Sequence, residues 1–314
     1  MRGDRPKEPP VPPVSPAVPD HVPLAWRGAL ALLTRLPQAA LSRGFGRVAD
    51  APIPAPLRRP LLGAFARAVG IDLAEAELPL EAYPTLDAFF VRRLTPGLRP
   101  FPGDGGTAGS PVDGIVGQLG EVRGGRAIQA KGRDYAVADL LDDEAAARRY
   151  EGGRFVTLYL SPRHYHRIHT PQAGTIPAAR HIPGALLPVN APAVARVPEL
   201  FPSNERLVCY VDAPLGRVAV VAVGAFNVGR ISAAFDPAWG AGPGATVTNR
   251  RGASPETRHY TPPVSVGVGA EIMAFHLGST VVCLFEAGAA RLEAALAPGA
   301  AVRLGQPIAR VASR

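Results

Sequence analysis

The stretch Leu277-Gly278-Ser279-Thr280-Val281-Val282-Cys283-Leu284-Phe285 places a serine directly after a glycine at the start of a continuous apolar run. The run predicts a buried strand. A serine hydroxyl in this place can attack the carbonyl carbon of the preceding glycine and convert the peptide bond into an ester. Elimination and hydrolysis would leave a ketone, a pyruvoyl group, at a new N-terminus. Gly-Ser-Thr is also an ordinary turn into a strand, so the rest of the chain has to distinguish the two interpretations.

Further short apolar runs, separated by Gly and Pro, follow residue 100; they are 155–160, 207–211 and 218–223. They predict a β core of the sandwich or barrel type. Residues 110–116 and 298–309 resemble the hairpins of lipoyl carriers, although no lysine lies at the tip of either. With the helical region described next, the predicted fold class is α+β, mainly β.

Three regions are predicted along the 314 residues: a disordered, proline-rich tail over 1–23, a helical region over 24–100 and a β-rich catalytic domain over 101–314. In the helical region, Leu61, Leu62, Phe65 and Val69 fall on one helical face. Seven arginines stand against one acid, Asp50, between residues 24 and 71: Arg27, Arg35, Arg43, Arg47, Arg58, Arg59 and Arg67. Such a basic segment suits an anionic lipid surface. A helical cap packed on the core is the alternative, and both can hold.

Composition narrows the possible functions. The net charge is +8, but only two of the 34 basic residues are lysines, Lys7 and Lys131, which disfavours a pyridoxal-phosphate enzyme with its lysine Schiff base. The aromatic content is 6%, without the arginine–aromatic interleaving that stacks bases, so no nucleic-acid partner is expected. The sequence has no apolar run long enough to span a membrane and no signal-peptide core, which predicts a cytoplasmic protein that rests on a membrane. Cys209 and Cys283 fit no metal or redox spacing.

Candidate chemistry gathers in the segment 161–171, which holds His164, His166 and His169. The His-x-His spacing makes a zinc hydrolase one alternative, although no further ligand pattern accompanies it and no metal is expected. A lipoyl-like binding module at the membrane is a non-enzymatic alternative. Asp113, in a Pro-x-Asp-Gly turn, either caps its own backbone or holds a histidine that deprotonates Ser279, as in an Asp-His-Ser triad.

The chain resembles the bacterial phosphatidylserine decarboxylases in a series of blocks in the same order. The blocks are 83–94, Arg99-Pro100, 110–114, 129–135, 165–171, 188–190, 200–206, 223–225 and 275–280. The departures lie at 268–276, where a lysine and a glycine of the common pattern are missing and His276 stands where lysine is common. They put the local geometry of the loop before Ser279 in doubt more than the reaction.

The resemblance implies a pyruvoyl-dependent proenzyme that cleaves itself between Gly278 and Ser279. Asp113 and His169 match the charge-relay partners of Ser279, and His166 matches a second histidine near the reacting centre. The implied cofactor is a covalent pyruvoyl group made from Ser279, and the implied reaction is decarboxylation of phosphatidylserine to phosphatidylethanolamine. The expected products of cleavage are a large chain 1–278 and a small chain 279–314 that stay together as a heterodimer, with a higher homo-oligomer possible. The expected location is the cytoplasmic side of the cell membrane, bound peripherally to anionic lipid.

Overall fold

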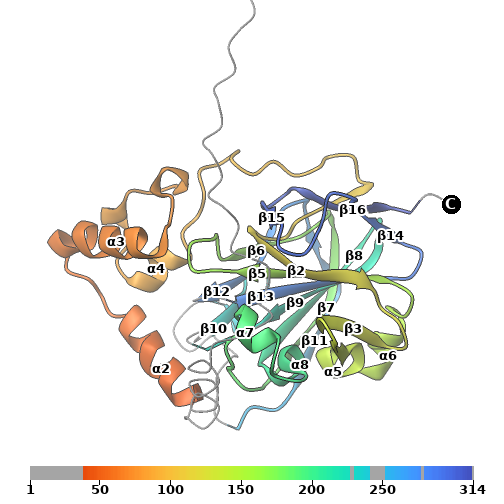
Figure 1. Ribbon diagram of the computed structural model, residues 1–314. Helices are drawn as coiled ribbons and strands as arrows, with labels where there is room; N and C mark the ends of the chain where they lie inside the picture. Colours follow the sequence, from red (N-terminus) through yellow and green to blue (C-terminus); the bar gives the residue numbers. More distant parts are fainter. Residues whose placement is uncertain (1–37, 227–229, 241–251, 277–278, 313–314) are drawn as a thin grey trace, which may run out of the picture.

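The computed structural model describes residues 38–226, 230–240, 252–276 and 279–312. The predicted tail 1–23, the first part of the helical region with Arg27 and Arg35, and Gly278 of the predicted cleavage site lie outside these residues. The described part is mainly β, as predicted, with the N-terminal helices at one side of the β core and further short helices elsewhere along it (Figure 1).

An eight-stranded antiparallel sheet forms the centre of the molecule, in the order β11-β7-β8-β9-β13-β5-β2-β15. Its strands are β2 (Gly114–Glu121), β5 (Arg154–Leu160), β7 (Gly174–Ile182), β8 (Arg206–Ala213), β9 (Gly216–Val223), β11 (Glu256–Val266), β13 (Ser279–Phe285) and β15 (Ala301–Val302). Because β11 and β15 remain at the edges, the sheet is open and the described residues form no closed barrel. The four predicted apolar runs become β5, β8, β9 and β13, since a strand buried on both faces reads as a continuous apolar run.

The strand that begins at Ser279 lies in the middle of this sheet. Every residue of β13 is buried, and the strand pairs with β5 on one side and β9 on the other. Ser279 lies opposite Leu160, the last residue of β5. The chain segments before Ser279 and after Leu160 therefore leave the sheet at the same end.

The two predicted hairpins pair with each other instead of folding back on themselves. β1 (Thr107–Gly109) pairs with β16 (Pro307–Val311), and β2 pairs with β15. β16 also pairs with β14 (Ala290–Leu292). The sequence pattern identifies strands and turns but not the partner of each strand, and here both partners come from the other end of the chain.

A third sheet, β10-β12-β6, joins segments around the candidate site. It consists of β6 (Arg167–His169), β10 (Arg230–Ala233) and β12 (Glu271–His276). A two-stranded ribbon, β3 (Arg126–Ala130) with β4 (Arg133–Ala136), completes the strands, and short helices border the core: α5 (Val137–Leu141), α6 (Glu144–Arg148), α7 (Ala191–Val194), α8 (Leu200–Ser203) and the 3₁₀ turn η3 (Pro237–Trp239).

The N-terminal helices α2 (Gln38–Ala49), α3 (Ala55–Val69) and α4 (Leu86–Phe90), with the 3₁₀ turns η1 (Leu73–Glu75) and η2 (Leu80–Ala82), lie together beside the β core (Figure 1). Leu62 and Ala66 of α3 are buried against Tyr83 and Phe89, and Phe65 and Val69 flank them. Leu61, on the same predicted face as Phe65, is 52% exposed and takes no part in this buried contact. The buried stripe follows Leu62 and Ala66, four residues apart, and Leu61 is turned away from it. No helix among the described residues is long and apolar enough to cross a membrane.

Candidate active site

Ser279 is the first residue of β13, and its side chain is almost completely buried, with 1% of the residue exposed. Its hydroxyl oxygen has no hydrogen-bond partner among the described residues. Leaving a buried hydroxyl unpaired costs about 1–3 kcal/mol. Buried side-chain hydroxyls are normally paired, so an unpaired one at this position calls for an explanation.

The histidine segment follows directly from the strand opposite Ser279. β5 ends at Leu160, a tight turn brings the chain to His164, and β6 begins at Arg167. The backbone N–H of Ser161 donates to His164 Nδ1 at 3.0 Å. Burial lowers the pKa of His164 to about 4, and the Arg163 guanidinium acts in the same direction. His164 is therefore neutral near pH 7.

His166 is fully buried against Phe90, with ring centroids 4.1 Å apart. Its Nδ1 lies 2.8 Å from the carbonyl oxygen of His164, so Nδ1–H donates and Nε2 carries the free lone pair. No described group pairs with that Nε2. Burial lowers the His166 pKa well below its usual value, and the charge of Arg92 adds to this effect. The side chain is a neutral imidazole with an open acceptor.

His169 is held from both ring nitrogens. Nδ1–H donates to the Gly269 carbonyl at 2.7 Å, and the Tyr165 hydroxyl lies 3.1 Å from Nε2. Burial lowers the pKa of His169, although the hydrogen bond to Gly269 opposes the shift. A backbone carbonyl therefore fixes the tautomer, leaving an Nε2 lone pair that the hydroxyl of Tyr165 can donate to.

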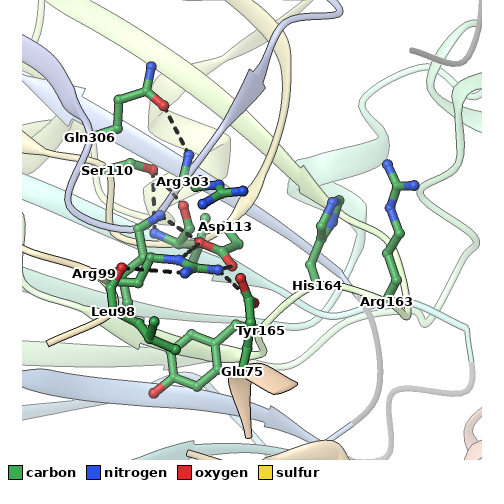
Figure 2. A network of polar contacts seen from close by, with 12 residues as sticks. Glu75, Leu98, Arg99, Ser110, Asp113, Arg163, His164, Tyr165, Arg303 and Gln306 are labelled. Atoms are coloured by element: carbon green, nitrogen blue, oxygen red, sulfur yellow. Dashed lines mark hydrogen bonds and ion pairs between the residues drawn. The ribbon is translucent and has the colours of Figure 1, made fainter. Parts of the chain in front are cut away.

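Asp113 makes its hydrogen bonds to other groups than His169. Arg99 Nε and Nη2 donate to its two carboxylate oxygens at 3.0 and 2.9 Å, and the backbone N–H of Leu304 donates at 2.7 Å. Arg99 Nη2 also donates to Glu75 at 2.8 Å (Figure 2). The turn that carries Asp113 nevertheless touches the histidine strand, because the backbone N–H of His169 donates to the Pro111 carbonyl at 2.9 Å.

The structure thus brings the Asp113 turn to His169 and the histidine segment to the strand of Ser279. Among the described residues, no series of hydrogen bonds links Asp113 to His169 and His169 to Ser279. The sequence alone assigns no function to Arg99, Tyr165 or the Gly269 carbonyl. Arg99 lay in a recognised block, but its pairing with Asp113 and Glu75 depends on packing that no local pattern encodes.

The described residues contain no group of three or more His, Cys, Asp or Glu side chains placed to hold a metal ion. Each of the three histidines of the segment has its own hydrogen-bond partner. His164 accepts from Ser161, His166 donates to His164, and His169 lies between Gly269 and Tyr165.

Comparison with known proteins identifies the family of the chain. The family model for phosphatidylserine decarboxylase matches residues 86–310. A phosphatidylserine decarboxylase proenzyme of Anaeromyxobacter sp. (strain K) is 48% identical over 279 residues, covering 89% of this chain and 96% of that protein. Proenzymes of the same name from Myxococcus xanthus and Azotobacter vinelandii are 44% and 43% identical, covering 88% and 87% of this chain and 96% and 94% of those proteins. The chain belongs to the phosphatidylserine decarboxylase family.

Proposed function

We propose that this protein cleaves itself between Gly278 and Ser279, converts Ser279 into a pyruvoyl group, and then decarboxylates phosphatidylserine to phosphatidylethanolamine. The observation that carries the proposal is the Ser279 hydroxyl, which is buried at the start of a central strand without a partner among the described residues. A family whose members are named proenzymes is consistent with such processing.

The cleavage needs only the chain and one water molecule. Ser279 Oγ forms a bond to the Gly278 carbonyl carbon, the C–N bond breaks, and the nitrogen takes up a proton. Loss of the α-proton of residue 279 then breaks its Cβ–Oγ bond and releases Gly278 as a carboxylate. The enamine left at residue 279 takes up water and releases ammonia, which leaves the keto group.

His169 is the base that we assign to Ser279. A general base needs a neutral imidazole with a fixed tautomer, and His169 has both. Asp113 is the third member of the proposed triad, from the turn whose Pro111 carbonyl accepts the His169 backbone N–H. Its ion pair with Arg99 holds the carboxylate in one orientation until the serine reacts.

A pyruvoyl carbonyl at position 279 supplies an electron sink for the pair of electrons released with CO₂. His166 contributes the proton transfers, because its Nε2 lone pair is open and faces no competing donor among the described residues. It relays the proton that the α-carbon takes up after CO₂ leaves.

The N-terminal helices supply contact with the lipid. Leu41, Phe45 and Val48 of α2 are exposed and lie on one helical face, and Leu57 and Leu61 repeat this on α3. Arg47, Arg59 and Arg67 are exposed on the same two helices. Apolar side chains flanked by arginines suit the head-group region of an anionic bilayer. We assign the cytoplasmic face of the cell membrane as the place where these helices dock.

The proposal is tested with purified protein and vesicles that contain phosphatidylserine. We expect release of CO₂ and formation of phosphatidylethanolamine, both abolished in Ser279→Ala and by a carbonyl reagent such as phenylhydrazine. The matched control is Ser265→Ala, which removes an exposed hydroxyl of β11 and leaves the reaction intact. Decarboxylation at the normal rate by Ser279→Ala would refute the proposal.

A further inference from the structure

A second polar cluster lies at the other side of the predicted cleavage bond, around His276. This histidine is the last residue of β12, is only 4% exposed, and is separated from Ser279 by Leu277 and Gly278 alone. Its Nδ1 lies 2.9 and 2.8 Å from the two carboxylate oxygens of Asp87. Its Nε2 lies 3.1 Å from Ser232 Oγ. Both ring nitrogens are therefore engaged.

Arg230 completes the cluster and connects it to α4 and to the residue that follows α2. Its Nη2 donates to Asp87 Oδ2 at 2.7 Å and lies 3.1 Å from His276 Nδ1. Its two terminal nitrogens each lie 3.1 Å from the carboxylate of Asp50. Burial alone would raise the pKa of Asp87, but the hydrogen bond with His276 and the charge of Arg230 outweigh it and lower that pKa. Asp87 is a carboxylate between two donors.

Hydrogen-bond partners at both ring nitrogens fix the orientation of the His276 ring. A cavity of about 90 Å³ borders the ring and is also lined by Ser232, Arg167 and Glu271. A side chain beside free space is held by its polar partners. A buried polar cluster of this kind often adds little net stability over an apolar one, so its value lies in specifying one geometry.

The cluster lies just before the proposed cleavage bond in the chain. His276 belongs to the sheet β10-β12-β6, and Ser279 begins a strand of the eight-stranded sheet. Only two residues of sequence separate His276 from Ser279. The cluster therefore anchors the chain before these two residues, and β13 anchors it after them. A displacement of about 1 Å can slow an intramolecular attack roughly 10²-fold.

We propose that Asp87 and His276 are positioning residues for the self-cleavage, because they anchor the chain two residues before the bond that is cut. The inference rests on the proposed cleavage at this bond. It assigns α4, a helix of the N-terminal region, a part in maturation that is separate from lipid contact. After cleavage, His276 and residue 279 belong to different chains. The contact between Asp87 and His276 then no longer positions residue 279, so the mature enzyme does not need it.

The test follows cleavage of freshly synthesised chain in a cell-free system, with the fragments resolved on a denaturing gel. We expect Asp87→Ala and His276→Gln to slow cleavage by about 10- to 100-fold, the range that such displacements produce. The double variant should be no slower than the slower single one, because the two side chains act as a unit. Decarboxylation per mole of cleaved chain should stay within about twofold of wild type.

Two further variants separate positioning from folding. His276→Asn places an amide donor where Nδ1–H stands, keeps the contact with Asp87, and should restore most of the cleavage rate. Asp212→Ala breaks an ion pair with Arg217 in the β8–β9 hairpin, at the end of β9 away from β13's first residues, and should cleave like wild type.

Wild-type cleavage rates in Asp87→Ala and His276→Gln would overturn the inference, as would an equal loss of decarboxylation per cleaved chain. An intact wild-type chain would instead refute the proposed function itself. If Asp87→Ala does not fold, the isosteric Asp87→Asn replaces it, with the same outcomes deciding.

Discussion

At the level of single residues, the proposed chemistry uses imidazoles that burial keeps neutral. His166 and His169 each donate Nδ1–H to a backbone carbonyl and are buried, so burial lowers the pKa of both. Each therefore presents Nε2 as a proton acceptor without an ionised partner on the ring. Asp113, which the sequence suggested for fixing the tautomer of His169, is bound to Arg99 in the structure, and Gly269 fixes the tautomer.

This arrangement predicts the pH dependence of self-cleavage. The base form of His169 is needed, and its pKa in the folded protein lies below the ordinary 6.5. The rate constant should therefore be flat above about pH 6.5 and fall at lower pH, once the imidazole takes up a proton. The rate constant is measured by following cleavage of freshly synthesised chain between about pH 5 and 8.

His169→Ala should slow the cleavage by about 10²–10⁴-fold, the usual contribution of a positioned base. His259→Ala, on the edge strand β11, is the matched control and should leave the profile unchanged. A rate that rises as the pH falls through this range, or normal cleavage by His169→Ala, would remove His169 from the triad.

At the level of elements, the strands were more predictable than their partners. The runs that became β5, β8, β9 and β13 are continuous and apolar because those strands are covered on both faces. β1 pairs with β16 and β2 pairs with β15, so each pair joins segments nearly 200 positions apart in the sequence. Local periodicity carries no information on such pairing. The same holds for His276 and Asp87, which lie 189 positions apart.

The helices α2 and α3 yield a prediction about lipid binding. Arg58 donates to the carbonyl oxygens of Ile53 and Glu81, so it has a structural role and is a poor probe. Arg47, Arg59 and Arg67 are better probes because their side chains are exposed. Each arginine near an anionic surface contributes about 1 kcal/mol, so changing all three to Gln should weaken vesicle binding roughly 10²-fold.

Sedimentation with anionic vesicles measures this binding, and cleavage should proceed normally in the triple variant. The control changes three exposed arginines of the β domain, Arg123, Arg291 and Arg303, to Gln. If both triple variants lost affinity equally, only the overall charge would matter and the helices would not be the docking surface.

At the level of the whole molecule, the predicted cut would divide the protein without separating its sheets. The segment after Gly278 supplies β13 to the centre of the main sheet and β15 to its edge, and it adds β14 and β16 to another sheet. β13 pairs with β5 and β9 along its length and is buried throughout. Cleavage before Ser279 therefore removes one peptide bond from the end of a strand and leaves its pairing in place.

We predict that the two fragments co-elute in native gel filtration and separate only in denaturant. Elution of the small fragment on its own, without denaturant, would show that the strand pairing described here does not hold the cleaved protein together.

The most direct test of self-processing is the intact mass of the purified wild-type protein under denaturing conditions. We predict two species, residues 1–278 and residues 279–314, with the smaller one lighter than a serine-ended peptide by the mass of ammonia and resistant to Edman degradation. The Ser279→Ala variant should give the uncut chain alone. A single full-length mass for the wild type, or a small fragment that begins with an unmodified serine, would contradict the conversion of Ser279 into a pyruvoyl group.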